Sequence, residues 1–291
     1  MGSFKISLKK IFQVIRYSIK FYINNSLHNA IYLSNYRKNS ISKKIRFRFL
    51  GDDFTSPLVN QTLLAIKAID ENKSLINSSY VELGSPSEIF DIGANIGYWS
   101  YSYLKLNSNK IEKLHCFEPY SISYNYLKSN LAEAKNAYLY NFGLSNEDTE
   151  DVISLPEWEL NRPNNLGLYS VYSKSNINAE TINLKKFDDI FTPQLNVNYL
   201  FKIDVEGMES KVIEGASRFL SSSNKISILI ELNKKIDQHT NNNIENTLQL
   251  LNRLNFCGYL FTNQSLKKIN FEDISYKVDN NLNYDFIFKN F

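Results

Sequence analysis

Apolar and polar positions along the chain predict strands and helices in alternation from residue 88 onward. Short apolar runs typical of buried strands cover residues 88–92, 113–117, 137–142, 199–205 and 225–232. Helical periodicity fills the gaps between them, with predicted helices ending at Leu106 and spanning 121–135, 208–220 and 244–256. This alternation predicts an α/β fold with a doubly wound, mostly parallel Rossmann-like sheet, covered by helices on both faces. The last apolar runs, 259–262 and 284–289, predict an antiparallel pair at one edge.

The first 79 residues follow a different pattern. Apolar side chains recur at steps of three and four, at Leu8, Ile11, Phe12, Ile15, Ile19 and Tyr22. This spacing predicts an amphipathic basic helix within residues 4–23. Residues 43–49 predict a short strand and residues 60–75 a further helix. We therefore expect an N-terminal basic helical extension over residues 1–79 and an α/β domain over residues 80–291.

Charge is distributed unevenly between these two parts. Residues 1–50 contain eleven Lys or Arg and no Asp or Glu, whereas the remaining residues carry 22 basic and 30 acidic side chains, a net charge of −8. Such asymmetry predicts that the basic arm meets an anionic surface, namely lipid headgroups, nucleic acid or the acidic body of the protein itself. Residues 4–23 could thus make peripheral contact with a membrane or pack on the body or on a second subunit. Charges interrupt the arm too often for a membrane-spanning helix.

Composition narrows the class of protein further. With 43% hydrophobic residues, 10 glycines and 6 prolines, the chain is predicted to be globular throughout. Cys116 and Cys257 offer no disulfide scaffold, and the three histidines form no close pair, so neither residue type predicts a metal site. The simplest location is a reducing cytoplasm, with the inner face of the membrane as a place where the arm could bind.

The first strand-to-helix turn is a predicted ligand site. It contains Asp91, Gly93, Ala94, Asn95 and Gly97, and Glu118-Pro119 follows at the end of the next predicted strand. In open α/β sheets ligands lie beyond the carboxyl ends of the strands, where a carboxylate can accept both ribose hydroxyls of an adenosine. A dinucleotide would favour G-x-G-x-x-G, and a purely structural turn is the other alternative. Two acids favour a cationic methyl donor over a pyrophosphate.

A second group of charged residues lies in and after the strand at 199–205. Lys202, Asp204 and Glu206 are spaced by two and are therefore predicted on one face, with Lys202 pairing one of the acids. Glu231 ends the next apolar strand and brings a further carboxylate to the same edge of the sheet. A helix-capping role for Asp204 and Glu209 is the alternative interpretation.

The ordered set of motifs resembles the FkbM family, a branch of the class I S-adenosylmethionine-dependent methyltransferases. The matching segments are D-x-G-A-N-x-G at 91–97, F-E-P at 117–119, L-x-x-N at 127–130, K-x-D-V-E-G-x-E at 202–209 and I-E at 230–231. A histidine that often follows the last motif in related sequences is replaced by Asn233.

The resemblance implies methyl transfer from S-adenosylmethionine to a hydroxyl of a sugar, nucleotide sugar or surface glycan. We expect Asp204 to act as general base, with Glu206 and Glu231 orienting the acceptor or helping to bind a divalent cation, an ion for which the sequence itself gives no support. The segment 156–172, with Trp158, Arg162, Tyr169 and Tyr172, could cover the acceptor or serve only in surface packing.

Two other functions remain open from the sequence. A methyltransferase acting on nucleic acid or protein could use the basic arm for docking, although the acidic body would repel phosphate, so we expect no nucleic-acid partner. A non-enzymatic, membrane-associated scaffold would not bind the methyl donor. The oligomeric state is not specified by the sequence.

Overall fold

The computed structural model describes residues 45–49, 52–56, 80–107, 109–157, 166–173, 175–240, 243–262, 265–279 and 285–291. The helices predicted at 4–23 and 60–75 lie outside these residues, as do Trp158 and Arg162. Strand β1 (Ile45–Phe49) confirms the strand predicted at 43–49 and pairs antiparallel with β2 (Asp52–Ser56), which the sequence did not predict. The boundary between residues 79 and 80 stays a prediction.

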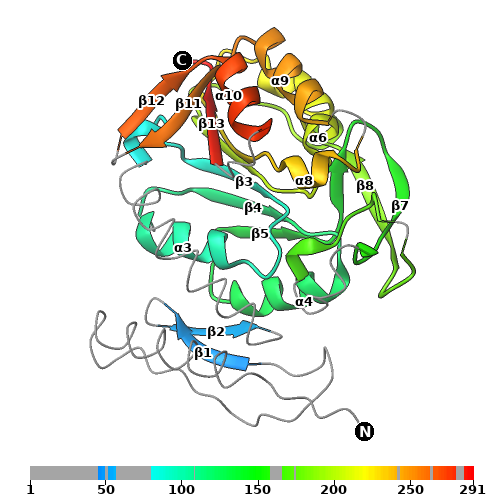
Figure 1. Cartoon of the computed structure of the whole chain (residues 1–291). Helices are drawn as coiled ribbons and strands as arrows, with labels where there is room; N and C mark the ends of the chain where they lie inside the picture. The colour runs from blue at the N-terminus through cyan, green and yellow to red at the C-terminus, as the bar shows by residue number, and fades with distance from the viewer. Residues whose placement is uncertain are drawn as a thin grey trace, which may run out of the picture.

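A central sheet of eight strands organises the described part of the chain (Figure 1). Its order is β12-β11-β13-β10-β9-β3-β4-β5, in which β3, β4, β5, β9 and β10 are parallel and β13 runs antiparallel to both of its neighbours. The strands are β3 (Glu88–Ile92), β4 (Lys113–Phe117), β5 (Ala137–Tyr140), β9 (Tyr199–Ile203), β10 (Ile226–Glu231), β11 (Cys257–Thr262), β12 (Ser265–Ile269) and β13 (Asp285–Lys289). The mostly parallel sheet predicted from the sequence is confirmed.

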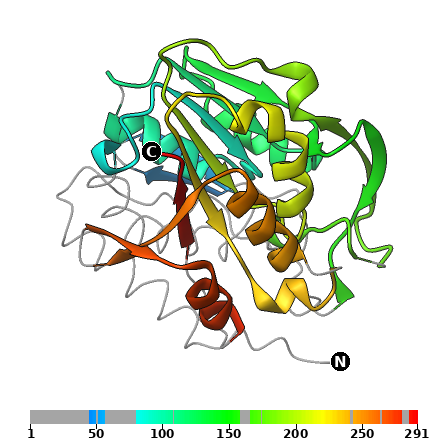
Figure 2. The same ribbon diagram turned by 90° about the horizontal axis from the view of Figure 1, so that it is seen from above.

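Helices cover both faces of this sheet (Figures 1 and 2). One face carries α3 (Tyr98–Asn107) and α4 (Ser121–Asn130); the other carries α6 (Glu209–Gly215), α7 (Ser217–Leu220), α9 (Asn243–Arg253) and α10 (Phe271–Asp279). Successive residues of each strand point to opposite faces of the sheet and pack into the hydrophobic core on that face. In β3, for example, Ile89 packs toward α3 while Phe90 packs toward α6 and α7, and both are fully buried.

The order of the strands places a ligand site beside β3. The chain leaves β3 toward β4 and β5 on one side, and returns to β9 and β10 on the other. At such a switch point the loops that follow neighbouring strands diverge to opposite faces and leave a crevice outside the carboxyl ends. The turn after β3, the acid after β4 and the acids after β9 therefore meet at one place.

A second, three-stranded sheet lies beside this crevice and was not predicted. It contains β6 (Gly143–Ser145), β7 (Thr149–Ile153) and β8 (Glu180–Lys186), in the order β6-β8-β7, and is followed by the short α5 (Phe187–Ile190). Figure 1 shows β7 and β8 extending from one end of the central sheet. The described residues between β7 and β8 include the single turn η2 (Leu166–Leu168), and Leu155, Leu166 and Tyr169 among them pack in one cluster with Ile96, Tyr120 and Met208, which follow β3, β4 and β9.

Several helices and strands differ from the boundaries or positions that the sequence predicted. The helix predicted at 208–220 is divided into α6 and α7 at Ala216, and α8 (Lys234–Asp237) is an additional short helix. The predicted antiparallel pair of β11 and β13 is confirmed, but β12 is the edge strand and β13 lies inside the sheet. None of the helices in the described ranges is long and apolar enough to cross a membrane.

Candidate active site

A cleft opens at the carboxyl ends of β3, β4 and β9. The space between its walls, counted together with the solvent at its open mouth, is about 850 Å³. Eight of the residues predicted from the sequence line it: Gly93, Ala94, Asn95, Glu118, Pro119, Lys202, Asp204 and Glu206. Three separate stretches of the chain therefore converge as predicted.

The glycine turn after β3 is held against both neighbouring strands. Gly93 has φ of +82°, and a Cβ atom there would lie 1.9 Å from the backbone oxygen of Asp204. Only glycine allows this approach. The Gly93 and Ala94 N–H groups both donate to the Phe117 carbonyl, at 3.0 and 2.9 Å. Both donors therefore bind within the fold, to β4, and are not available to a ligand.

Glu118 stands at the end of β4 with its carboxylate oriented by the backbone. Its Oε2 accepts from the Asn95 N–H at 2.8 Å and its Oε1 from the Tyr120 N–H at 2.9 Å. Burial raises the pKa of Glu118 to about 7, although both backbone hydrogen bonds act to lower it. Because a carboxylate oxygen can accept more than one hydrogen bond, each oxygen keeps capacity for a ligand hydroxyl.

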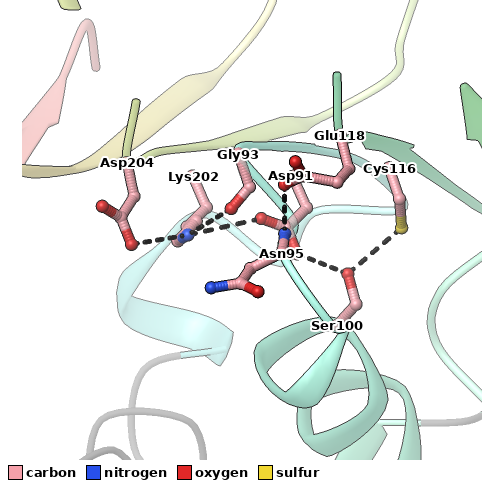
Figure 3. A network of polar contacts seen from close by, with 8 residues as sticks. All are labelled: Asp91, Gly93, Asn95, Ser100, Cys116, Glu118, Lys202 and Asp204. Atoms are coloured by element: carbon pink, nitrogen blue, oxygen red, sulfur yellow. Dashed lines mark hydrogen bonds and ion pairs between the residues drawn. The ribbon is translucent and has the colours of Figure 1, made fainter. Parts of the chain in front are cut away.

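Lys202 links the carboxyl ends of β9 and β3 (Figure 3). Its Nζ donates to Asp204 Oδ2 at 3.0 Å and to the Gly93 carbonyl at 3.2 Å, and lies 3.6 Å from Asp91 Oδ1. Burial alone would lower the pKa of Lys202, but the charges of Asp204 and Asp91 outweigh it and raise this pKa above its usual value. The predicted pairing of Lys202 with an acid is confirmed, and Lys202 remains a cation that orients Asp204.

Asp91 and Gly97 lie beneath the cleft, away from its lining. Asp91 is fully buried and accepts a hydrogen bond from the Ser100 hydroxyl at 2.5 Å, while Ser100 also contacts Cys116 Sγ at 3.2 Å (Figure 3). Burial raises the pKa of Asp91. Gly97 has φ of +86°, and a Cβ atom there would meet Leu127 of α4 at 2.7 Å. Neither residue lines the cleft, so Asp91 and Gly97 can affect a ligand only through the conformation of the glycine turn.

The acids after β9 do not continue the strand. Strand β9 ends at Ile203, so Glu206 is not on the same strand face as Lys202, and that part of the prediction is wrong. Glu206 and Gly207 instead adopt left-handed conformations with φ of +50° and +106°. We call residues 204–207 the acid loop. This bend turns Glu206 back so that it still lines the cleft together with Asp204.

A smaller cavity adjoins the cleft on the far side of the acid loop. Asp204 and Glu206 line both spaces, and Glu231 and Glu209 line the second. Glu209 is buried; it accepts hydrogen bonds from the Gly207 N–H and the Asn243 side-chain amide, so it holds the acid loop and the start of α9. Glu231 therefore reaches the second cavity and not the main cleft.

The closely spaced carboxyl groups raise one another's pKa values. The charge of Asp204, followed by burial and the charge of Asp285, raises the pKa of Glu231 to about 8. Burial, followed by the charges of Asp204, Glu231 and Glu209, raises the pKa of Glu206 well above its usual value. Within the described ranges, no group of three or more His, Cys, Asp or Glu has the geometry to hold a metal ion.

Tyrosines and apolar residues close the rest of the cleft. Tyr169 stacks on Tyr120 at 4.4 Å between ring centroids, and Leu166, Tyr169 and Val171 line the cleft from the segment between β7 and β8. Tyr98, the first residue of α3, lines the opposite side, and burial raises its pKa above the usual value. The segment 156–172 was predicted either to cover the acceptor or to pack on the surface. Of its two described tyrosines, Tyr169 lines the cleft, whereas Tyr172 packs against Gly207.

The model of the methyltransferase FkbM domain matches residues 91–261, more than half of the chain. The chain belongs to the FkbM methyltransferase family. The matched region begins at Asp91 and includes the glycine turn, Glu118, the acid loop and Glu231, so every predicted site residue of the chain falls inside it. No curated protein sequence matches the chain.

Three solved methyltransferase structures show a distant likeness to this chain. An FkbM methyltransferase from Methylobacillus flagellatus KT is 15% identical with a TM-score of 0.43; the match covers 70% of this chain and 43% of that one. M. jannaschii TYW2 in complex with AdoMet is 11% identical over 89% and 90% of the two chains, with a TM-score of 0.42. An O-methyltransferase from a Brevibacillus brevis multienzyme, in complex with S-adenosyl-L-homocysteine, is 11% identical over 79% and 75%, with a TM-score of 0.41. The chain spans less than half the length of the first of these proteins.

The structure adds residues that the sequence did not single out. Asn141 donates from its side-chain amide to the carbonyls of Glu118 and Pro119, and so fixes the turn after β4. Ser100 supports Asp91, and Tyr98 borders the cleft. The position of Tyr98, directly after the glycine turn, was a usable signal for a residue of the cleft, whereas nothing in the sequence marked Asn141.

Proposed function

We propose that the protein is an S-adenosylmethionine-dependent O-methyltransferase whose acceptor is a hydroxyl of a sugar, nucleotide sugar or surface glycan. The observation that carries this proposal is the cleft itself. An oriented carboxylate, Glu118, lies at the end of β4, and a second one, Asp204, lies across the same cleft beside the cation that holds it.

The residues of the cleft fit the methyl donor. Glu118 retains acceptor capacity for the two ribose hydroxyls, and Leu144, Ile153 and Leu184 offer an apolar surface for adenine. The side-chain oxygen of Asn95 is buried and has no hydrogen-bond partner among the residues that the structure describes, so it is available to a donor group of the ligand. When bound, S-adenosylmethionine supplies an electrophilic methyl group on a sulfonium, a cation that acidic walls accept.

Asp204 is the proposed general base. An alcohol is a weak nucleophile until its proton is removed, and a carboxylate at the edge of a closed cleft can accept that proton. Lys202 orients this carboxylate, and its raised pKa excludes Lys202 from accepting a proton at neutral pH. Glu206, and Glu231 through the second cavity, would accept hydrogen bonds from other hydroxyls of the acceptor.

The walls of the cleft favour a polyhydroxylated, ring-shaped acceptor. Carboxyl groups accept hydrogen bonds from sugar hydroxyls, and flat tyrosine rings such as Tyr169 and Tyr98 suit the apolar faces of sugar rings. Among the described residues that line the two cavities, Lys202 is the only basic one, and it is paired with Asp204, so the cleft offers little to bind the phosphates of a nucleic acid.

The proposal is tested by comparing glycans from cells with and without the protein. We expect mass spectrometry of nucleotide sugars and surface glycans to show a species heavier by one methyl group only when the protein is present. Loss of methylation from RNA or protein, with glycans unchanged, would instead support an acceptor docked by the basic arm. Failure to bind S-adenosylmethionine in calorimetry would contradict an enzymatic role.

Donor binding should depend on pH through Glu118. With a pKa of about 7, the Glu118 carboxyl gains a proton as the pH falls and can no longer accept two ribose hydroxyls. Affinity for S-adenosylmethionine should therefore approach its full value at about pH 8, be about half of it at pH 7, and fall by about a further fivefold between pH 7 and pH 6. Calorimetry at a series of pH values measures this, and Glu118→Gln should bind more weakly with that pH dependence removed. A wild-type affinity that stays constant from pH 8 to pH 6 would rule out this role.

A further inference from the structure

The segment between β7 and β8 is joined to the acid loop by one buried hydroxyl. Ser154 and Ser170 exchange backbone hydrogen bonds at 3.2 and 3.0 Å, which closes the segment at its base. From there, the Ser170 hydroxyl donates to the carbonyl of Glu206 at 2.9 Å, and Ser170 is only 4% exposed. A wall of the cleft thus holds the backbone of the loop that carries Asp204.

The residue held by Ser170 has an unfavourable backbone conformation. Glu206 has φ of +50°, a left-handed value that costs free energy for any residue with a Cβ atom. Residues in such conformations persist only where surrounding contacts fix them, and they are concentrated at functional sites. The next residue, Gly207, adopts φ of +106° without that cost, so the strain in the acid loop falls on Glu206.

Other contacts fix the two ends of the acid loop but not its centre. Lys202 binds Asp204 at one end, and the Glu209 carboxylate accepts the Gly207 N–H at the other. The Glu206 carbonyl lies between these two ends. Within the part of the chain that the structure describes, it accepts its hydrogen bond from the Ser170 hydroxyl. Without this bond, Glu206 can relax to a right-handed or extended conformation and take its carboxyl group out of the cleft.

We propose that Ser170 is a positioning residue for methyl transfer, which holds Glu206 in its left-handed conformation and thereby keeps the acceptor side of the cleft in its reactive arrangement. This inference rests on the proposed function, because it assigns the acid loop to the acceptor. It makes the segment between β7 and β8 a part of the catalytic apparatus, in addition to its role as a wall. Ser170 lines the cleft, but its hydroxyl donates to the Glu206 carbonyl, so the effect that we propose is exerted through Glu206.

The chain provides a closely matched control in Ser175. The Ser170 hydroxyl donates to a carbonyl and accepts the Tyr172 N–H two residues later; the Ser175 hydroxyl donates to the Leu155 carbonyl and accepts the Ile177 N–H two residues later. Both serines are buried, at 4% and 8% exposure. The two differ in that Ser175 binds within its own segment, whereas Ser170 binds the acid loop.

The test compares Ser170→Ala with Ser175→Ala. The rate of methyl incorporation from S-[methyl-³H]adenosylmethionine into glycans extracted from cells that lack the protein should fall by about tenfold in Ser170→Ala, the change expected from one hydrogen bond. The rate should stay within about twofold in Ser175→Ala, and the affinity for S-adenosylmethionine, measured by calorimetry, should be equal in both. Equal rates in the two variants would overturn the proposal.

A second measurement decides the question without any acceptor. In protein labelled with ¹³C at glutamate carboxyl groups, NMR titration should show the pKa values of Glu206 and Glu231 moving toward their usual values in Ser170→Ala but not in Ser175→Ala. Unchanged titration in both variants would contradict the role of Ser170. If the wild-type protein neither binds S-adenosylmethionine nor transfers methyl, the proposed function fails, while this titration still reports whether Ser170 positions the acid loop.

Discussion

Replacing Asp204 with asparagine is expected to lower the rate of methyl transfer by a factor of about 10²–10⁴, the range that a positioned general base contributes. Asparagine has nearly the same shape and its side-chain oxygen can still accept the hydrogen bond from Lys202, so the cleft should keep its geometry. What it loses is the ability to take a proton from the acceptor hydroxyl.

Calorimetry with S-adenosylmethionine provides the control for this variant. Asp204→Asn should bind the donor within about threefold of the wild-type affinity, because Glu118 and the apolar surface of the cleft are unchanged. A variant that binds the donor and transfers methyl at the wild-type rate would remove Asp204 from the role of base and direct attention to Glu206.

Gly93→Ala should have the largest effect on stability. A methyl group there would lie 1.9 Å from the Asp204 carbonyl, at φ of +82°, and backbone atoms cannot move aside as a flexible side chain can. We expect a loss of about 3 kcal/mol or more in the free energy of unfolding, together with loss of donor binding, since the glycine turn and the acid loop must separate.

Gly258→Ala in β11 is the matched comparison, measured by denaturant or thermal unfolding. Its new Cβ atom would approach the side-chain end of Ile274 at 2.7 Å, and a rotamer change can relieve this contact. The expected loss is about 1 kcal/mol with donor binding retained. A Gly93→Ala variant as stable as Gly258→Ala would show that the close approach of β3 and β9 is not required.

The fold and the site were predicted best from the sequence where a long apolar run ends in a charged residue. Strand β4 was predicted with its observed bounds. The acids at the ends of β4, β9 and β10 could be predicted as site residues because a charge next to an apolar run is costly to bury unless it pairs with another charge or contacts a ligand. The three-stranded sheet was missed since β7 and β8 carry charged and polar residues on an exposed face, as in Glu150 and Asn183, and lack an apolar run.

The finer features of the site depend on backbone angles and long-range contacts. Two-residue spacing predicted Glu206 on a strand face, but the strand ends before it and a left-handed residue redirects its side chain. Asp91 was expected beside the ligand because of its charge, yet it lies under the turn with Ser100 and Lys202. The contact of Ser170 with Glu206 joins residues 36 positions apart, and no local pattern marks such a pair.

The interior position of β13 has a consequence for synthesis of the protein on the ribosome. This strand inserts between β10 and β11, and Phe286, Ile287 and Phe288 are fully buried there. Until residue 289 has left the ribosomal exit tunnel, β10 and β11 each expose an apolar strand edge that can pair with another chain. The sheet can therefore close only after residue 289 has emerged, and until then these two edges need protection from aggregation.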